Sequence, residues 1–424
     1  MTAQIPLVQS ALAACLAVAA IFVARRPTAA SARSAAVGAS ASAVALLVAI
    51  ALVSAGSALD ADHARDGALA PLVVALIGLL ACALAPIDTH APRAMAAVVG
   101  STSLAIGSVV APSVLVTAVA VVAGPWLAWC AVARTAGSLR SRVCAAYLVP
   151  MSVLVVSGAS LVALGEPSAI AASLVGAGLA IRAGMVPAQT WVPALVDHAP
   201  AGVSVALLGS TLAILPSVLG TLAPGGGPLP DACVAVGAIT ALLGGGAALA
   251  ARSPRRLLGY LFVTQAGLVA MCAAAPAEIP TASLELTWAS IGLSTSAFGM
   301  CLAAIESRRG VASLLRPTGV FAQTPRLAAA CLVAGLAAVG APISAVFVGL
   351  DRIVEETAAS SWLAASCALV GSTLAAIAVV RAAFVMFGGA RGDHATAALD
   401  LSHRESWALA ASFAFLLGTT WLHY

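Results

Sequence analysis

Lysine is absent from this chain, and charge of either sign is scarce. All 20 basic residues are arginine, and charged residues fill 8% of the 424 positions. A soluble domain carries about a quarter charged residues, whereas this chain is 62% hydrophobic with a mean hydropathy of +1.06. We therefore expect an all-α integral membrane protein. The net charge of +4 comes from short arginine groups beside apolar runs and gives no indication of nucleic-acid binding.

The sequence also lacks the usual patterns of metal, disulfide and cofactor chemistry. Its nine cysteines are scattered, nearly all within apolar runs, and they form no CxxC pair or Cys/His cluster. No nucleotide, quinone or metal motif occurs. We therefore expect no cofactor and no catalytic chemistry in the chain itself.

Apolar runs of about 20 residues recur along the chain, and a helix needs about that many to cross the hydrocarbon. We count fourteen, at approximately 5–23, 35–54, 68–86, 94–110, 112–133, 143–164, 168–190, 203–222, 232–250, 257–275, 284–305, 327–349, 361–386 and 405–421. No basic region precedes the first run, and no convincing cleavage site follows it. We interpret it as a retained helix. The sequence thus predicts one polytopic membrane domain over residues 1–424.

The arginines provide an independent check on this count. Sixteen of the 20 fall in loops on one predicted side, and the opposite loops hold only Arg65 and Arg352 among several acids. Arg182 and Arg381 lie within apolar runs. By the positive-inside rule the arginine-rich loops face the cytoplasm, so both termini are expected on the outer face of the cytoplasmic (inner) membrane.

Arg182 lies deep in the seventh apolar run, and Pro187 follows it five residues later. Proline removes a backbone donor and bends or breaks a helix. A broken helix in lipid is tolerated where protein or a water-filled cavity meets the freed carbonyls, and a buried charge beside one marks many ion paths. The alternative is an ordinary kink, with Arg182 snorkelling to an interface. Pro342 marks a similar position in the twelfth run, with Asp351 and Arg352 just beyond.

The residues after the seventh run carry a specific pattern. It reads Pro187-x-x-x-Trp191-x-Pro193, followed by Asp197-His198-Ala-Pro200-x-x-Val-Ser204. The pattern resembles the signature of the antiporter-like subunits (L/M/N-type) of respiratory complex I. The same signature occurs in Mrp-type cation/proton antiporters, membrane-bound hydrogenases and the membrane subunit of DAB-type inorganic-carbon transporters. Weaker matches extend the resemblance over roughly residues 66–420: Arg255-Arg256, Thr264-Gln265-Ala-Gly267 and Glu405-Ser-Trp407.

The resemblance implies about fourteen transmembrane helices, with the seventh and twelfth broken, and an inverted repeat of five-helix units. It implies a membrane subunit of a multi-subunit complex that translocates protons or cations, as in NADH-quinone oxidoreductases and Mrp antiporters. The implied partners are other membrane subunits, a soluble catalytic partner and the lipid bilayer. The expected polar site comprises Arg182, Asp197, His198, Asp351 and Arg352. The expected helix-break and motif residues are Pro187, Trp191, Pro193, Pro200, Ser204, Gln265 and Pro342.

The chain departs from this family at the residues that relay protons. The family's lysine in helix seven is Arg182 here, and helix five has no acid. The positions of an expected histidine and two further lysines fall near Leu208, Ser296 and Gly349 or Leu350. A buried lysine can release its proton, whereas arginine stays charged. Hydroxyls with water offer another path, but helix hydroxyls usually bond their own backbone; the candidates are Thr190, Ser204, Ser210, Thr211, Ser294, Thr295 and Ser296.

Two alternatives to an ion-translocating subunit therefore stay open. One is a degenerate, non-conducting membrane scaffold, and the other is the membrane subunit of a DAB-type inorganic-carbon uptake complex. In each case we expect the chain to work in a hetero-oligomer. Arg182 is expected to set the electrostatics of a polar site and to pair with an acid, of which Asp197 is nearest in sequence and Glu306 and Asp351 are further choices. Arg182→Lys should then preserve assembly, and Arg182→Leu should destabilise the break.

Overall fold

The computed structural model describes residues 4–423, except 57–60, 89, 134–137, 166–168, 223–228, 274–280, 310–312, 318, 320, 322, 343 and 390–399. The regular elements in this part of the chain are α-helices: α1 (Gln4–Ala24), α2 (Ala29–Gly56), α3 (Ala61–Ala83), α4 (Pro92–Val110), α5 (Val114–Val132), α6 (Ser138–Ala163), α7 (Ala169–Ala183), α8 (Trp191–His198), α9 (Ala201–Leu222), α10 (Leu229–Ala250), α11 (Pro254–Ala273), α12 (Thr281–Arg309), α13 (Pro325–Ala338), α14 (Ala345–Ser360), α15 (Trp362–Phe387) and α16 (His403–His423).

The predicted all-α membrane protein is confirmed. Within the described ranges, nine helices are long and apolar enough to cross a bilayer, and three shorter apolar stretches lie at Leu69–Ala83, Ala169–Ala183 and Pro325–Ala338. Membrane helices keep all backbone hydrogen bonds internal, which is why such a composition folds this way. The exact number of crossings stays a prediction.

Two helices separated by a short break occur at the seventh and twelfth apolar runs, although α8 begins at Trp191, just past the predicted end of the seventh run at residue 190. The first pair is α7 and α8, and the second is α13 and α14. The predicted end of the twelfth run, at residue 349, is wrong, because α14 continues to Ser360. Its later turns carry charged residues on an exposed face, and apolar patterning does not detect helix of that kind.

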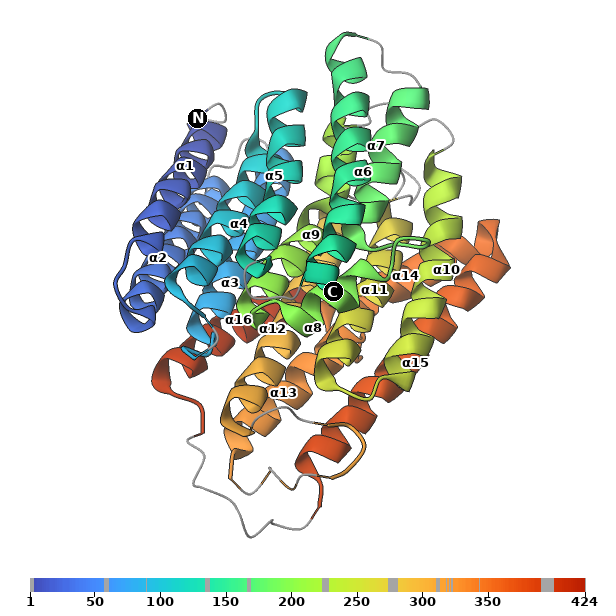
Figure 1. Ribbon diagram of the computed structural model, residues 1–424. Coiled ribbons are helices and arrows are strands. Elements are labelled where there is room, and N and C mark those ends of the chain that lie inside the picture. The colour runs from blue at the N-terminus through green and yellow to red at the C-terminus, as the bar shows by residue number, and fades with distance from the viewer. Residues whose placement is uncertain are drawn as a thin grey trace.

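Burial decides which helices form the centre of the bundle. The apolar window of α12 is entirely buried and that of α9 is 89% buried, whereas those of α1, α2 and α6 are only 22–28% buried. Figure 1 shows α1 and α2 on one flank and α10 and α15 on the other, with α9 and α12 between them. The central pair therefore has protein on all sides, and the flanking helices present exposed apolar faces.

Glycines allow close helix contacts on the α10 side. A Cβ on Gly237 of α10 would lie 2.6 Å from the carbonyl oxygen of Gly267 of α11. Gly245 of α10 meets the backbone of Gly371 of α15 in the same way. Small residues let helix backbones approach where lipid provides no hydrophobic drive for association. The alanine- and glycine-rich composition thus fixes α10 between two neighbours.

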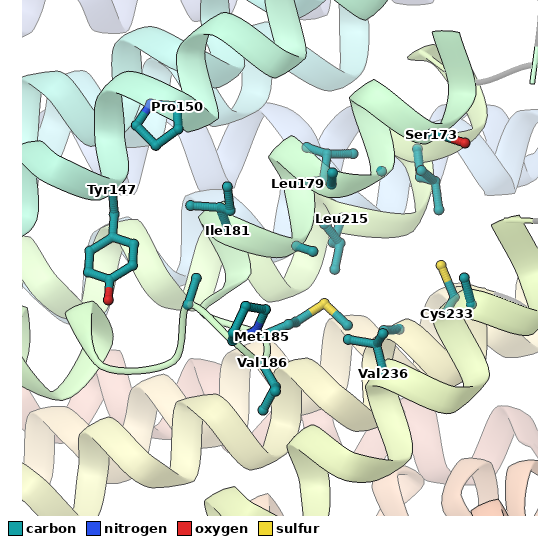
Figure 2. A pocket seen from close by; sticks show the side chains of 18 of the residues that line it. Tyr147, Pro150, Ser173, Leu179, Ile181, Met185, Val186, Leu215, Cys233 and Val236 are labelled. Carbon is teal, nitrogen blue, oxygen red and sulfur yellow. The ribbon is translucent and has the colours of Figure 1, made fainter. Parts of the chain in front are cut away.

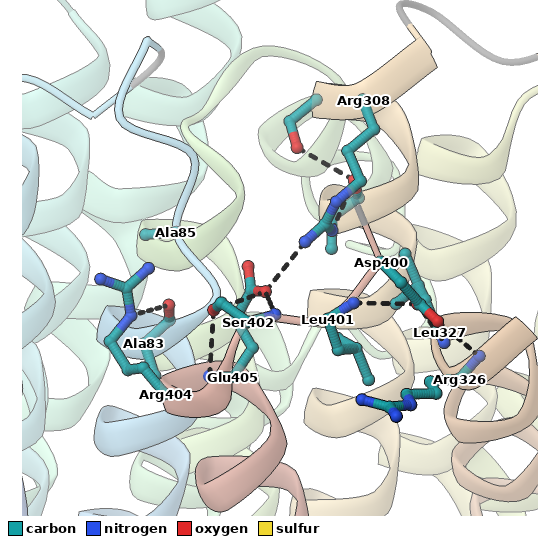
Figure 3. Close-up of polar contacts among 12 residues, drawn as sticks. Ala83, Ala85, Arg308, Arg326, Leu327, Asp400, Leu401, Ser402, Arg404 and Glu405 are labelled. Carbon is teal, nitrogen blue, oxygen red and sulfur yellow. Dashed lines mark hydrogen bonds and ion pairs between the residues drawn. The ribbon is translucent and has the colours of Figure 1, made fainter. Parts of the chain in front are cut away.

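Helix α16 is tied to three distant helices by polar contacts (Figure 3). Glu405 pairs with Arg308 of α12 at 2.8 Å, and Arg404 Nε donates to the carbonyl of Ala83 at 3.1 Å. Just before α16, the Asp400 carboxylate accepts from the backbone N–H groups of Arg326 and Leu327 at 3.0 and 3.1 Å. Asp400 thereby satisfies the free donors at the start of α13.

Candidate functional site

The break between α7 and α8 covers residues 184–190 and begins at a glycine. Gly184 has φ +73°, and its N–H donates to the carbonyl of Ile181 at 3.0 Å. The N–H of Met185 donates to the carbonyl of Ala180 at 2.9 Å. This pair of bonds is a Schellman cap, which glycine favours because it adopts positive φ without strain. The prediction that Pro187 itself breaks the helix is therefore wrong.

Pro187 lies three residues beyond that cap, exposed in the segment between the two helices and after a cis Val186–Pro187 bond. Trp191 then starts α8, and its indole Nε1 donates back across the break to the carbonyl of Ile181 at 2.7 Å. Pro193 packs on α11, since a Cβ at Gly259 would be 2.6 Å from its Cα. The motif residues thus hold α8 against α7 and α11.

Pro200 and Ser204 occupy the start of α9, immediately after α8. The carbonyl of Pro200 accepts from the N–H groups of Val203 and Ser204 at 2.9 and 3.2 Å. The Ser204 hydroxyl donates to the carbonyl of Ala201 at 3.0 Å. Both residues therefore shape the first turn of α9 through local hydrogen bonds.

Arg182 is buried in the last turn of α7, with 3% of its surface exposed. Its Nη1 donates to the carbonyl of Val121 in α5. That carbonyl is available because Pro125, four residues later in the same helix, has no N–H to offer it. The guanidinium lies beside Gly124, where a Cβ would be in ordinary van der Waals contact with its nitrogens at 3.8 Å. The cation of one helix thus binds a carbonyl freed in another.

The expected pairing of Arg182 with an acid is not what the structure shows. Asp197 binds Arg256 at 2.9 Å and Glu306 binds Arg255 at 2.8 Å. Asp351 is exposed on α14. Among the described residues, no ion pair includes Arg182. The reason is that α8 turns its charged end toward α11, so that Asp197 faces the basic turn that opens α11.

An arginine cap, formed by Arg255, closes the end of α8. Arg255 Nη1 donates to the carbonyls of Asp197, Val196 and Ala199 at 3.0, 3.3 and 3.3 Å, while its Nε holds Glu306. A cation at a helix C-terminus satisfies free carbonyls and complements the helix dipole. His198, beside it, makes a 2.8 Å bond from Nδ1 to the carbonyl of Ala194.

Loss of the arginine cap should weaken the fold. We expect Arg255→Met to lower the free energy of unfolding by about 2–3 kcal/mol, because Glu306 loses its partner and the α8 carbonyls lose their donor. The two side chains are 27% and 24% exposed, so the effect falls short of that for a fully buried pair. Thermal unfolding in mild detergent measures it. Arg256→Met is the matched control, expected at about 0–1 kcal/mol, because Arg256 is 63% exposed. Equal shifts for both variants would contradict the prediction.

His90 joins this junction from the loop between α3 and α4. Its side chain is fully buried, Nδ1 lies 3.0 Å from the carbonyl of Pro86, and Nε2 accepts from the N–H of Gly202 at 3.0 Å. This pattern requires the neutral ring with its proton on Nδ1. The pKa of His90 is lowered to about 4, mainly by burial, with smaller contributions from the nearby charges of Arg255 and Arg33. His90 thus holds the first turn of α9 as a neutral acceptor.

The second break, residues 339–344 between α13 and α14, repeats the first. Gly340 has φ +77°, its N–H donates to Ala337 at 3.3 Å, and the N–H of Ala341 donates to Leu336 at 2.9 Å. Each bond lies 156 residues after its counterpart in the first break. Pro342 sits within this segment, again beyond the glycine cap and not at the helix end.

Gln265 is the motif residue that reaches the second break. It is buried in α11, and its Nε2 donates to the carbonyl of Ala338 at the end of α13, at 2.6 Å. At the first break the Arg182 side chain of α7 donates to a carbonyl of α5. At the second break Ala338, which lies 156 residues after Arg182, offers its carbonyl to a side chain of α11. Each helix end is therefore joined to another helix by one hydrogen bond between a side chain and a carbonyl. Asp351 and Arg352 are not part of this contact, because both are exposed further along α14.

The α9–α12 interface carries the hydroxyls considered as a proton path. Thr211, Ser294 and Ser296 donate to carbonyls four residues earlier in their own helices at 2.6–2.7 Å. The Oγ of Ser210 and the Oγ1 of Thr295 are buried, and no described residue bonds them. Ser290 Oγ and Gln265 Oε1 share that state. These four oxygens lie on α9, α11 and α12 and are among the buried polar atoms of the described residues that remain available to water.

Three features of the site were missed by sequence reasoning. The Val121 carbonyl had a signal, namely Pro125 four positions later, which frees the acceptor. Gly184 had one too, because glycine after an apolar helical run favours a cap. His90 had none, since a lone histidine in a loop does not reveal that its ring is buried against the start of a helix.

Sequence comparison gives related proteins over much of the chain. Residues 148–376 match the family described as NADH:quinone oxidoreductase/Mrp antiporter, TM. NADH-quinone oxidoreductase subunit N of Mycobacterium sp. (strain JLS) is 32% identical over 287 residues, covering 63% of this chain and 58% of that protein. Subunit N 1 of Streptomyces griseus subsp. griseus is 35% identical over 227 residues, covering 50% and 46%. The matches thus span about half the length of these curated relatives.

Solved structures share the fold over nearly the whole chain. A chain of respiratory complex I from Thermus thermophilus superposes with a TM-score of 0.80, covering 97% of this chain and 95% of that one at 19% identity. A chain of the Mrp complex from Dietzia sp. DQ12-45-1b gives 0.79, with 98% and 94% covered at 19% identity. Because the family match covers more than half of its residues, the chain belongs to the NADH:quinone oxidoreductase/Mrp antiporter transmembrane family.

Proposed function

We propose that this chain is a membrane subunit of a multi-subunit complex of the complex I or Mrp type, and that it takes part in proton translocation. The observation that carries the proposal is the pair of interrupted helices, each capped by a glycine and joined at its end to a second helix by a buried side chain. Breaks of this kind expose backbone groups that can bind ions or water. Its partners are other membrane subunits and a soluble catalytic partner, because this chain offers no cofactor motif.

The proton path uses hydroxyls and water, since the chain has no lysine. Ser210, Ser290, Thr295 and the Gln265 carbonyl oxygen supply unbonded polar atoms on three central helices. Water bridging such groups would satisfy them, because buried polar atoms otherwise cost free energy. Arg182 stays charged and fixed on Val121, so it shapes the field around the path and relays nothing.

Removing two of the unbonded hydroxyls should slow translocation. We expect Ser210→Ala with Thr295→Val to lower proton flux in vesicles holding the reconstituted complex at least about tenfold, since a lost hydrogen bond in the path adds about 1.4 kcal/mol to the barrier. Flux is followed with a pH-sensitive dye. The control pair is Ser204→Ala with Thr211→Val, whose hydroxyls bond their own helix. Equal loss in both pairs would exclude the path.

A non-conducting scaffold is the second candidate, favoured by the packing of the central helices. A Cβ on Gly349 would clash with the Thr287 side chain, and a Cβ on Gly209 would require the Ser296 hydroxyl to move. These are positions at or beside those where the resemblance expects relay residues. A complex that assembles fully but conducts no more than empty vesicles would support the scaffold.

We further propose that the sixteen helices make fourteen crossings, with α7–α8 and α13–α14 each forming one interrupted crossing. The matching breaks 156 residues apart support an inverted repeat within a single domain. The arginine distribution supports both termini on the outer face of the cytoplasmic membrane.

Cysteine labelling tests this topology. In a background without the native cysteines, Gly137→Cys and Ala312→Cys should react only after the cytoplasmic face is opened; both positions lie outside the described residues. Ser360→Cys, exposed at the end of α14, should react with an impermeant maleimide in intact cells. Labelling of position 137 or 312 from outside would reverse the orientation.

A further inference from the structure

An elongated cavity of about 660 Å³ lies beside the α7–α8 break, between α6, α7, α9 and α10, with Ala270 of α11 at its base. Figure 2 shows Tyr147 at one end and Ser173 and Cys233 at the other, with Met185 and Val186 along one side. The volume falls within the range of about 300–1,000 Å³ typical of ligand pockets. The proposed proton path does not use this cavity.

The lining offers an occupant almost nothing polar. None of the described residues that line the cavity is charged. The Tyr147 hydroxyl already pairs with the Thr190 hydroxyl at 2.8 Å, and the Ser173 hydroxyl donates to the carbonyl of Ala169 at 2.6 Å. The lining side chains therefore offer a head group few hydrogen-bonding groups: the Tyr147 and Ser173 hydroxyls, which are already engaged, and the Cys233 thiol. The walls therefore select a hydrocarbon.

The cavity opens on an exposed flank of the bundle. Ala146 and Pro150 of α6, Ala177 of α7 and Ala232 of α10 are lining residues that are also exposed. On the same helices, apolar side chains point outward, such as Ile170 at 67% exposure. Bilayer acyl chains are thus the apolar molecules at this opening. An unfilled apolar cavity loses contacts on its walls and takes up apolar ligands in preference to water.

We propose that this cavity binds one acyl chain of a membrane phospholipid, inserted from the bilayer between α6, α7 and α10. The chain lies against Met185, Val186, Pro187 and Ala188, and so it covers much of the first break. The acyl chain fills the cavity and contacts its apolar walls. It thereby packs against the segment that follows the glycine cap and stabilises it. The bound lipid is therefore a structural part of the break.

A photoreactive lipid tests the site. The complex is reconstituted into phosphatidylethanolamine/phosphatidylglycerol vesicles with a trace of phospholipid carrying a diazirine at the end of one acyl chain. Illumination and peptide mass spectrometry should locate adducts on residues 185–188 and on the Cys233–Val236 turn. A diazirine on the head group should leave these positions unlabelled.

Filling the cavity gives the matched comparison. Ala177→Trp and, as a second choice if that variant does not assemble, Ala146→Trp should lose the cavity adducts. Val119→Trp on α5 should keep them, since Val119 is 62% exposed and outside the lining. Adducts that persist in the filled variants, or that spread evenly over exposed helices, would overturn the proposal. Displacement by an isoprenoid quinone but not by unlabelled phospholipid would also overturn it and indicate a quinone site.

Discussion

Arg182→Leu is expected to raise the passive proton permeability of the reconstituted complex about tenfold. A unit charge shifts the energy of a proton about 10 Å away by about 1.7 kcal/mol at an effective dielectric constant of about 20. That shift corresponds to a factor of about 18 in rate, which is of the order of tenfold. Arg182 is buried and bound to a neutral carbonyl, so within the described residues no ion pair offsets its field. Dye-monitored proton leak under an imposed pH gradient is the measurement.

The same substitution should change stability little, unlike the sequence-based expectation of a weakened break. Losing the donor to Val121 costs about 1–3 kcal/mol. Removing a cation from the membrane interior relieves about 2.5–3.5 kcal/mol on insertion scales. The terms offset, so we expect a change in the unfolding free energy of no more than about 2 kcal/mol. Had an acid been the partner, its uncompensated charge would have added a large penalty.

Two further variants define this effect. Arg182→Lys should keep the complex assembled, because a cation remains beside Val121. Arg381→Leu is the matched control: Arg381 also lies in an apolar helix and donates to a backbone carbonyl, that of Ala251, at 2.7 Å. Its removal should leave proton leak at the parent level. An unchanged leak in Arg182→Leu would make Arg182 a bystander.

Acid should destabilise the protein through His90 by about 3 kcal/mol. Its pKa is about 4 in the fold, against about 6.5 in an unfolded chain. Between these values the unfolded state binds a proton that the folded state does not. Stability is therefore complete above about pH 6.5 and falls as the pH drops toward about 4. Protonation would also place a second N–H against the N–H of Gly202.

Thermal unfolding across pH 4–7 measures this dependence. His90→Gln, which keeps an acceptor for Gly202, should flatten the profile over that interval. His198→Gln is the matched control, because the His198 ring bonds the Ala194 carbonyl of its own helix. A parent profile that His90→Gln leaves unaltered would show that another group controls acid sensitivity.

The sequence predicted the site's location better than its chemistry. Composition and run length suffice for membrane helices, because the cost of burying charge in lipid leaves few alternatives. The Pro187–Ser204 motif located the first break within a few residues. Its cause was misassigned, because proline and glycine both interrupt helices and only backbone geometry shows that Gly184 acts first.

Partner assignments could not be predicted, because they depend on how helices distant in sequence pack. Asp197 is 15 residues from Arg182, yet α8 carries it toward α11 and Arg256. Asp351 follows a break in sequence, yet α14 turns it outward. His90 gained its role through contact with Gly202, 112 residues later. Such pairings follow from tertiary packing, for which local pattern holds no signal.

Asp400 has a consequence for how the chain is made. It supplies the first-turn acceptors of α13 from a position 73 residues further on. During synthesis α13 therefore leaves the ribosome before Asp400 does, and its first N–H groups lack these acceptors until Asp400 has emerged. Arg404 and Glu405 follow Asp400. Arg404 then binds α3, and Glu405 binds α12. Helix α13, which precedes the second break, thus acquires its first-turn acceptors late in translation, after the first break has all its contacts.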